Sequence, residues 1–420
     1  MSEVGAAMDT MADALRAAAG PELFHRNAFR ITGLPTTADR IAVHRRHEQA
    51  SVAGHPADVD PADVRDACER LLEDPRRRLI DELFWLWEVP GGGCECATSL
   101  HEQHDRAVIM YGRALDRELR DDSDDAAQEH LWSDASRRWD ALLRDEGLYE
   151  HLLHRVRALD NARLPETVVD EIRAGLPATL LQPLVMVAVA AKDPARAARF
   201  ARNWPGRPEL AEDLLARTAD PLYGEVEAVA VRVRALLEAG VVDSAIDEAK
   251  SAMGTLTRLR VLLPATEHRR TAHTSELIAV AFNNCASRLY EQSGPLADRF
   301  AELFPVAAEL AVTTHTRQTI SENRQIIGAA ADQLTMGVRL VRQFADAGQP
   351  VVAGEEADRL RRELAEIPGA VAEIDRTLDE LRERRRLPET AGSKLGSWLM
   401  AAVLITVVLA VIMVLYFPIG

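Results

Sequence analysis

Two cysteines and two histidines near residue 100 have the side chains and the spacing to bind a metal ion. Cys94 and Cys96 are two residues apart in a Gly/Cys loop, 90–97, and His101 and His104 are three residues apart, on one face of a helix. Two thiolates and two imidazoles form a donor set that suits tetrahedral zinc. The pattern predicts a structural zinc site that ties the loop to the following helix. The alternative is that these are loop thiols and surface imidazoles without a metal.

No sequence motif in the chain points to catalysis. It has no P-loop, no G-x-G-x-x-G segment after a strand, no H-E-x-x-H and no G-x-S-x-G. We therefore predict that the protein is not an enzyme, with no catalytic residue and no cofactor other than the structural zinc. The formal net charge of −16 should repel nucleic acids, so we expect no nucleic-acid partner.

The composition favours an all-α protein. Hydrophobic residues make up 47% of the chain and aromatic residues only 5%, and Ala, Leu, Arg, Glu and Asp dominate. These residues favour helices, whereas a sheet-rich chain would need more β-branched and aromatic side chains. The length of 420 residues leaves room for two or three domains or for one extended helical array.

The N-terminal body is expected to be cytoplasmic. Residues 1–20 lack the basic start and apolar core of a secretory signal, and we expect them to be disordered or frayed. The four cysteines do not have the spacing of a disulfide framework in a secreted domain.

One long apolar segment lies at the C-terminal end. From Trp398 to Phe417 the chain has no charged residue, and at ~1.5 Å rise per residue this segment spans roughly 30 Å, the thickness of a bilayer's hydrocarbon core. We predict a linker, 388–395, followed by a single transmembrane helix, 396–417; the alternative is a buried core helix. Arginines upstream of the span place the body on the cytoplasmic side of a single-pass, C-terminally anchored membrane protein.

Residues 21–89 have the pattern of a small helical module. A threonine just before Ala38 can cap a helix that carries basic side chains, among them Arg45 and Arg46. A stretch rich in Gly, Pro and Asp then predicts a loop. Beyond the loop, apolar residues at helical spacing predict a second helix that ends at an Asp-Pro pair, and a third helix follows.

In this order the pieces resemble a J domain, the module that docks on the seventy-kilodalton heat-shock chaperone. The matching segments are FRITGLPTTADRI, the basic helix, a His-Pro loop and ACERLLEDPRRRLIDELF. The family's working motif is His-Pro-Asp, whereas here the third position is Ala57 and the aspartate follows one residue later. The resemblance implies that chaperone docking would use His55, Pro56, Asp58, Arg45 and Arg46. The alternative is a generic three-helix domain in which the His-Pro pair is merely a turn.

Residues 98–350 predict a succession of helix pairs with short turns. Three segments share a helix–turn–helix pattern, with small residues where helices must pack closely and, in two of them, Gly240 or Gly294 at the turn. This alternation of large and small residues resembles divergent tetratricopeptide repeats, and the resemblance implies an array that binds a partner protein.

Two residue pairs in this array are candidates for partner binding. Trp132 and Trp139 are seven residues apart on one helix face and could line a groove for a peptide; alternatively, they pack between stacked helices. Asn283 and Asn284 could hydrogen-bond an extended peptide backbone, or they could cap or bridge a helix.

Residues 351–387 carry apolar side chains spaced alternately by four and three, the heptad pattern of an amphipathic stem. Pro368 interrupts the pattern, and an interior proline costs a helix ~3 kcal/mol, so we expect a kink or two helices. Two arrangements remain open: a parallel homodimer through the heptads at 360–381, and two helices packed back onto the array.

These features together predict a J-like helical domain, a helical repeat array, a heptad stem and a C-terminal anchor. The predicted function is that of a membrane-tethered, non-catalytic scaffold for protein–protein interaction at the cytoplasmic face. The alternative is a tail-anchored co-chaperone of the J-domain type that recruits a seventy-kilodalton heat-shock chaperone.

Overall fold

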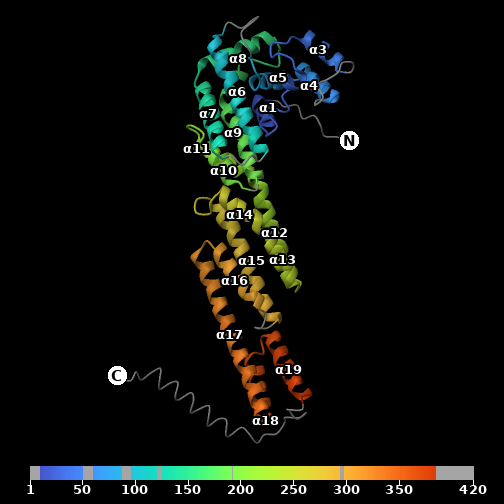
Figure 1. The fold of residues 1–420 in the computed structure, drawn as a ribbon, viewed down its shortest axis with the longest axis vertical. Helices are drawn as coiled ribbons and strands as arrows, with labels where there is room; N and C mark the ends of the chain where they lie inside the picture. The colour runs from blue at the N-terminus through green and yellow to red at the C-terminus, as the bar shows by residue number, and fades with distance from the viewer. Residues whose placement is uncertain are drawn as a thin grey trace, which may run out of the picture. The chain divides into compact units, whose positions relative to one another are not determined.

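The computed structural model describes residues 10–50, 60–87, 96–120, 125–191, 193–293 and 298–384. All regular secondary structure in these residues is helical, from α1 to α19, which confirms the all-α prediction (Figure 1). The chain divides into two compact units. Unit 1 comprises Met1–Leu222 and Thr257–Pro264, and unit 2 comprises Tyr223–Leu256 and Ala265–Gly420.

Short helices open unit 1. Apolar side chains of the second, third and fourth helices form one core, with Phe29, Val43 and Leu71 almost fully buried. The third helix begins at Arg40 because the Asp39 carboxylate accepts a hydrogen bond from the backbone N–H of Ala42, at 2.8 Å. The threonine cap predicted from the sequence would have started this helix near Ala38, two residues earlier. The helices are α1 (Met11–Ala18), α2 (Ala28–Thr32), α3 (Arg40–Gln49), α4 (Pro61–Glu73) and α5 (Pro75–Leu83).

Buried polar contacts hold the junction between α4 and α5. Asp74 ends α4 and caps α5, since its carboxylate accepts from Arg77 N at 3.0 Å. Arg78 is buried and donates to the carbonyl oxygen of Ala38 at 2.5 Å. Asp81 is also buried, with its carboxylate 3.1 Å from Arg77 Nε. The Asp-Pro pair seen in the sequence therefore marks the point where α4 ends and α5 begins, with Asp74 as the cap of α5.

The larger part of unit 1 consists of longer helices in which α6 pairs with α7 and α9 packs against α1, α10 and α11. Tyr111 of α6 is buried, and its hydroxyl donates to the carbonyl oxygen of Leu180 in α9 at 2.5 Å. The end of α14 closes the unit: Arg258 donates to the carbonyl of Val189, and Arg202 donates to the carbonyl of Leu262. The helices are α6 (Thr98–Leu119), α7 (Asp125–Leu143), α8 (Glu146–Leu159), α9 (Val168–Ala190), α10 (Ala195–Arg202), α11 (Pro208–Thr218) and α14 (Met253–Leu262).

Among the described residues, α9 alone is long and apolar enough to cross a membrane, judged by length and composition. Most of its apolar window, 61%, is buried inside the structure, as in the core helix of a soluble domain. The helix also contains Pro177 and Pro183. The predicted transmembrane helix, 396–417, and the linker, 388–395, lie outside the described residues.

Unit 2 begins with helices in which α15 packs against α13 and α16. Tyr223 and Thr271 join α12 to α15 through a hydrogen bond of 2.6 Å between their buried hydroxyl groups. The predicted repeat domain, 98–350, thus extends over parts of both units rather than forming a single one. The helices are α12 (Asp220–Glu238), α13 (Val242–Ser251), α15 (Arg269–Ser293) and α16 (Asp298–Leu310).

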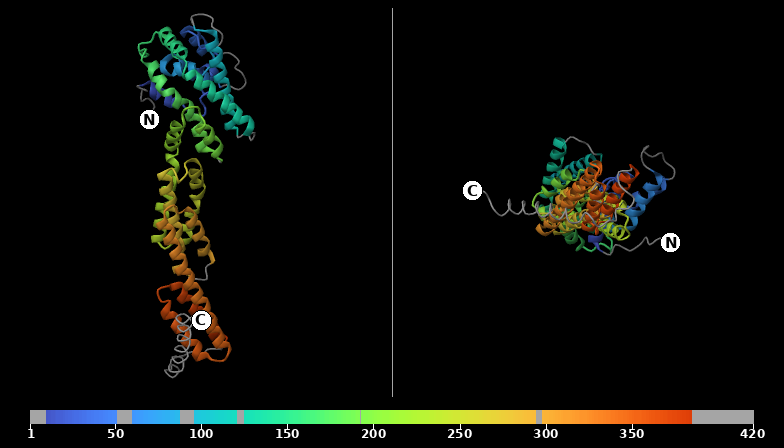
Figure 2. Two further views of the ribbon diagram at one scale, coloured as in Figure 1. Left: turned by 90° about the vertical axis from the view of Figure 1, so that its left-hand side faces the viewer. Right: turned by 90° about the horizontal axis from the view of Figure 1, so that it is seen from below.

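Three helices end the described chain: α17 (Thr314–Asp346), α18 (Pro350–Glu363) and α19 (Pro368–Glu383) lie side by side in unit 2 (Figures 1 and 2). The heptad pattern breaks where Pro368 begins α19. The apolar residues of the heptad pattern pack against α17 within one chain. The heptad residues in this core are Leu360, Leu364, Ile374, Leu378 and Leu381.

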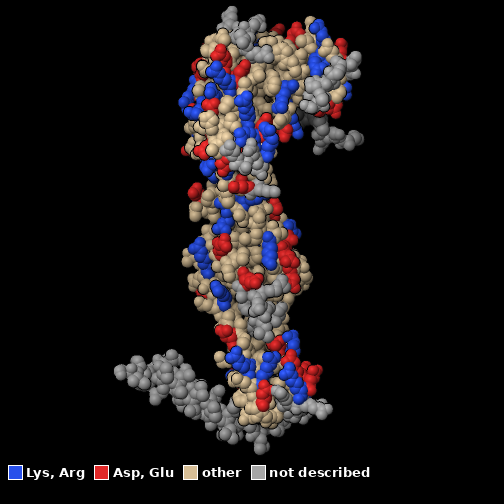
Figure 3. Space-filling model, in the orientation of Figure 1, with Lys and Arg blue, Asp and Glu red and all other residues tan. Residues whose placement is uncertain are grey.

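Charged side chains cover the outside of this three-helix core. On the face shown in Figure 3, acidic and basic side chains are interspersed over α17 to α19. Several of them pair, for example Arg342 with Glu380 at 3.3 Å. Small residues allow close packing inside: a Cβ atom added at Gly337 of α17 would lie 2.9 Å from Leu360 Cγ of α18.

Candidate functional site

Aromatic rings stack in unit 1 where the chain leaves α5 and where α6 and α8 lie close together. Trp87 is sandwiched between two histidines: His104 of α6, with ring centroids 3.5 Å apart, and His151 of α8, at 3.8 Å. The Trp87 indole N–H donates to the carbonyl oxygen of Glu82 at 3.0 Å, and the backbone N–H of Trp87 donates to Asp105 Oδ1 at 2.8 Å. These contacts fix the planes of all three rings.

Cys96 and His101 join His151 to form a cluster of metal-ligand side chains, hereafter the Cys–His cluster. One donor atom from each of the three residues lies within 4.8 Å of the others. The rings of His101 and His151 meet edge to face, with centroids 5.1 Å apart. A further histidine, His154, stands one turn beyond His151 on α8, with Nδ1 3.8 Å from Cys96 Sγ.

Burial lowers the pKa of two imidazoles at this cluster, those of His151 and His104. The hydrophobic surroundings of His151 lower its pKa to about 2, because burial penalises the charged ring and neighbouring histidines and Arg155 add repulsion. Burial also lowers the pKa of His104. A neutral imidazole is the form that binds a metal ion.

The structure thus brings together part of the ligand set predicted from sequence. Cys96 and His101 lie in the cluster, whereas Cys94 lies outside the described residues. His104 is engaged differently: its Nε2–H donates to the carbonyl oxygen of Leu83 at 2.8 Å, and its Nδ1 lies 3.2 Å from Asp105 Oδ1. The histidines that the sequence analysis missed have a recognisable signal, because His151 and His154 repeat the H-x-x-H spacing of His101 and His104.

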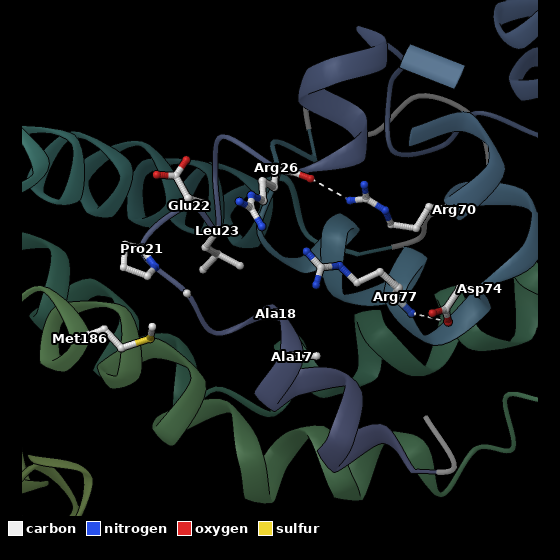
Figure 4. Close-up of a pocket in the computed structure, with 11 residues that line it drawn as sticks. Ala17, Ala18, Pro21, Glu22, Leu23, Arg26, Arg70, Asp74, Arg77 and Met186 are labelled. Carbon is white, nitrogen blue, oxygen red and sulfur yellow. Dashed lines mark hydrogen bonds between the residues drawn. The ribbon is translucent and has the colours of Figure 1, made fainter. Parts of the chain in front are cut away.

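A second candidate site is a pocket of about 580 Å³ in unit 1, hereafter the arginine pocket. Figure 4 shows the side chains of Arg26 and Arg77 directed into it, while Arg70 donates to the carbonyl oxygen of Arg26 at 2.9 Å. Arg77 also pairs with Asp81. Two carboxylates, Glu22 and Asp74, also line the pocket, and the rest of its wall is largely apolar and comes from α1, α9 and the segment after α1. These apolar residues are Ala17, Ala18, Pro21, Leu23 and Met186.

The predicted chaperone-docking residues are described only in part. The described residues do not include His55, Pro56 and Asp58. On α3, Arg45 is exposed to solvent. Arg46 is half-buried and its Nε donates to the carbonyl oxygen of Thr32 at 2.7 Å, a contact within the module.

The two tryptophans of α7 lie in the core of unit 1. Trp132 is 3% exposed and its indole N–H donates to Glu118 Oε1 at 3.2 Å. Trp139 is fully buried, with its ring 5.8 Å from those of Phe84 and His104. Both side chains therefore pack between helices, which is the second of the two interpretations that the sequence left open.

The two asparagines of α15 differ from each other. Asn283 is buried, and its side-chain oxygen accepts from Asn323 Nδ2 of α17 at 3.1 Å, so it bridges two helices. Asn284 lines a groove of about 460 Å³ between α12 and α15, beside Arg234 and Arg288. Only Asn284 of this pair is placed to meet a ligand in the groove.

Comparisons of this chain with protein-family models, with curated proteins and with solved structures find no match. The proposed function therefore rests on the chemistry of the candidate sites described above.

Proposed function

We propose that this protein is a membrane-tethered, non-catalytic scaffold that holds a partner protein at the cytoplasmic face of a membrane. The tether is the apolar segment 396–417, whose length and lack of charge suit a bilayer. Anchoring raises the local concentration of the scaffold, so that even a weak contact with the partner gains affinity. The proposed docking of a partner protein rests on the arginine pocket.

The chemistry of the arginine pocket favours a partner segment that combines a carboxylate with an apolar side chain. Arg26 is exposed and reaches into the pocket from the rim, where its guanidinium can bind a carboxylate in bidentate fashion (Figure 4). The apolar wall opposite, with Met186 partly exposed, offers a flexible surface for a neighbouring hydrophobic group. The pocket is built from several helices of one unit, so it should exist before the partner binds.

Site-specific photo-crosslinking in the full-length, membrane-bound protein tests this proposal. A photoreactive amino acid at the exposed position Ala17 should capture a discrete partner protein, whereas the same amino acid at Glu129 of α7, which does not line the pocket, should not. Arg26→Glu should weaken capture about 10- to 100-fold, as expected when a charge-assisted hydrogen bond worth ~1.5–3 kcal/mol is lost.

The matched control is Arg30→Glu, which makes the same charge change at an exposed position of α2 outside the pocket. Capture that is equally sensitive to Arg30→Glu would show that the effect comes from net charge alone. The absence of any crosslinked species at Ala17 would remove the docking role.

A second candidate function is that of a J-type co-chaperone, favoured by the exposed Arg45 on α3, ten residues before the His-Pro pair in the sequence. Purified full-length protein in detergent would then stimulate ATP hydrolysis by a seventy-kilodalton heat-shock chaperone. Asp58→Asn should abolish that stimulation and Asp63→Asn, an exposed change on α4, should not. Stimulation with this pattern would place the co-chaperone function ahead of the scaffold.

A further inference from the structure

The Cys–His cluster combines one thiol with two imidazoles of unit 1. Cys96 precedes α6, His101 lies in the first turn of α6, and His151 lies on α8, fifty residues further along the chain. Both histidines are almost fully buried, at 4% and 3% exposure, while Cys96 is half-exposed. Such convergence of sulfur and nitrogen donors at one point is what a metal centre requires.

We propose that Cys96, His101 and His151 bind a zinc ion and that His154 completes the tetrahedral shell from the exposed side. Zinc takes sulfur and nitrogen ligands at ~2.3 Å and ~2.0 Å, so neighbouring donor atoms lie roughly 3.3–3.8 Å apart around the ion. The separation of 3.8 Å between Cys96 Sγ and His154 Nδ1 already fits this geometry. Calcium and magnesium are excluded by the donor types, because both prefer oxygen ligands.

The site is preorganised on its imidazole side and adjustable on its thiol side. The stack with Trp87 holds the ring of His151, and Trp87 also meets His101 edge to face, with centroids 5.4 Å apart. Cys96 stands outside the helix and can move toward the ion by the ~1 Å that closes the shell to zinc distances. The N-terminus of α6 lies next to Cys96, and its dipole favours the negative charge of the thiolate that zinc needs.

Zinc bound in this way ties the start of α6 to α8 across the stack. Binding replaces the thiol proton of Cys96 with the metal and releases that proton to solvent, while the imidazoles bind as neutral ligands. Four protein ligands leave no open position for a water molecule, so the ion has a structural role and not a catalytic one. This proposal does not depend on the scaffold function.

Metal analysis of the purified full-length protein in detergent tests the proposal. The protein should contain about one zinc per chain, and cobalt(II) in its place should give the d–d absorption of a tetrahedral site together with a thiolate-to-cobalt charge-transfer band. Cys96→Ser should abolish the charge-transfer band. His151→Gln and His154→Gln should each weaken zinc binding by more than the ~10- to 100-fold typical of losing a mere outer-shell partner.

Two control variants separate ligand loss from unfolding and from binding elsewhere. Cys285→Ser changes a buried thiol of unit 2, and His130→Gln changes an exposed histidine of α7; both should keep full zinc content. Since His154 is exposed, His154→Gln should stay folded even if His151→Gln does not. Protein that takes up neither zinc nor cobalt, or a folded Cys96→Ser variant that keeps the charge-transfer band, would overturn the proposal.

Discussion

The indole ring of Trp87 and the imidazole of His104 lie almost parallel, with planes 9° apart and centroids separated by 3.5 Å. Both rings are buried, and each has a hydrogen bond to a backbone carbonyl of the segment that ends α5. The contact therefore joins the end of α5 to α6 both through ring stacking and through hydrogen bonds.

Replacing Trp87 should consequently cost much more than replacing the tryptophan two residues earlier. Trp87→Ala should lower the free energy of unfolding by about 3–5 kcal/mol, the usual cost of truncating a large buried aromatic residue. Trp85 is only half-buried, so Trp85→Ala should cost clearly less. Denaturant unfolding of the two variants measures the difference, and equal losses would show that the stack adds nothing.

Two glycines of α17 should respond in opposite ways to alanine. At Gly337 the new methyl group would collide with Leu360, so Gly337→Ala should destabilise the protein by about 1–3 kcal/mol, as overpacking does. At Gly328 nothing lies within 4 Å, so Gly328→Ala should stabilise it by up to ~1 kcal/mol through helix propensity. Thermal unfolding of both variants tests the predicted opposite signs, and a shift in the same direction contradicts the packing of α17 on α18.

The buried carboxylate of Asp81 should be essential for the packing of α5 against α2. Its loss removes the carboxylate that pairs with Arg77 and an acceptor for the backbone N–H of Ala28. Asp81→Ala should therefore cost about 3–5 kcal/mol, the range for breaking a buried pair on one side. Asp63→Ala on the exposed side of α4 should change stability by less than ~0.5 kcal/mol in the same urea titration.

The thiol of Cys285 should resist alkylation in the native protein up to strongly alkaline pH. Burial raises its pKa to about 12, whereas an unfolded chain loses the thiol proton near pH ~8.5. Because the folded-state pKa is the higher one, the stability that this group contributes is present below pH ~8.5 and is lost as the pH rises toward 12. Iodoacetamide at pH ~9.5 should modify the Cys285 peptide quickly in urea and slowly without it. Equal labelling rates would contradict the burial.

Local patterns in the sequence predict the helices well. Heptad spacing around Leu360 and Leu378 identifies the apolar face of α18 and α19, and the Asp-Pro pair marks the junction between α4 and α5. The spacing cannot choose the partner of that face, because a second chain and α17 would bury the same side chains. In α9, Pro177 and Pro183 lie inside the helix.

The candidate sites depend on contacts that are distant in sequence, and these are much harder to predict. Cys96 and His101 are found by their spacing, but His151 joins them only because α8 packs beside the stack. The arginine pocket likewise needs Arg26 from the segment after α1 and Met186 from α9, which have no shared motif. Short-range spacing therefore identifies half of a site and leaves its completion to the tertiary fold.

The return of the chain to unit 1 through Thr257–Pro264 has a consequence during synthesis. When Leu222 leaves the ribosome, α14 is still to be translated. The hydrogen bonds from Arg258 to the Val189 carbonyl and from Arg202 to the Leu262 carbonyl therefore cannot yet form. Unit 1 therefore cannot complete its packing until residues 223–264 have been translated. Until then α9 can already pack against α1, α10 and α11, which all precede Leu222, but the carbonyl of Val189 at its C-terminal end still lacks the hydrogen bond from Arg258.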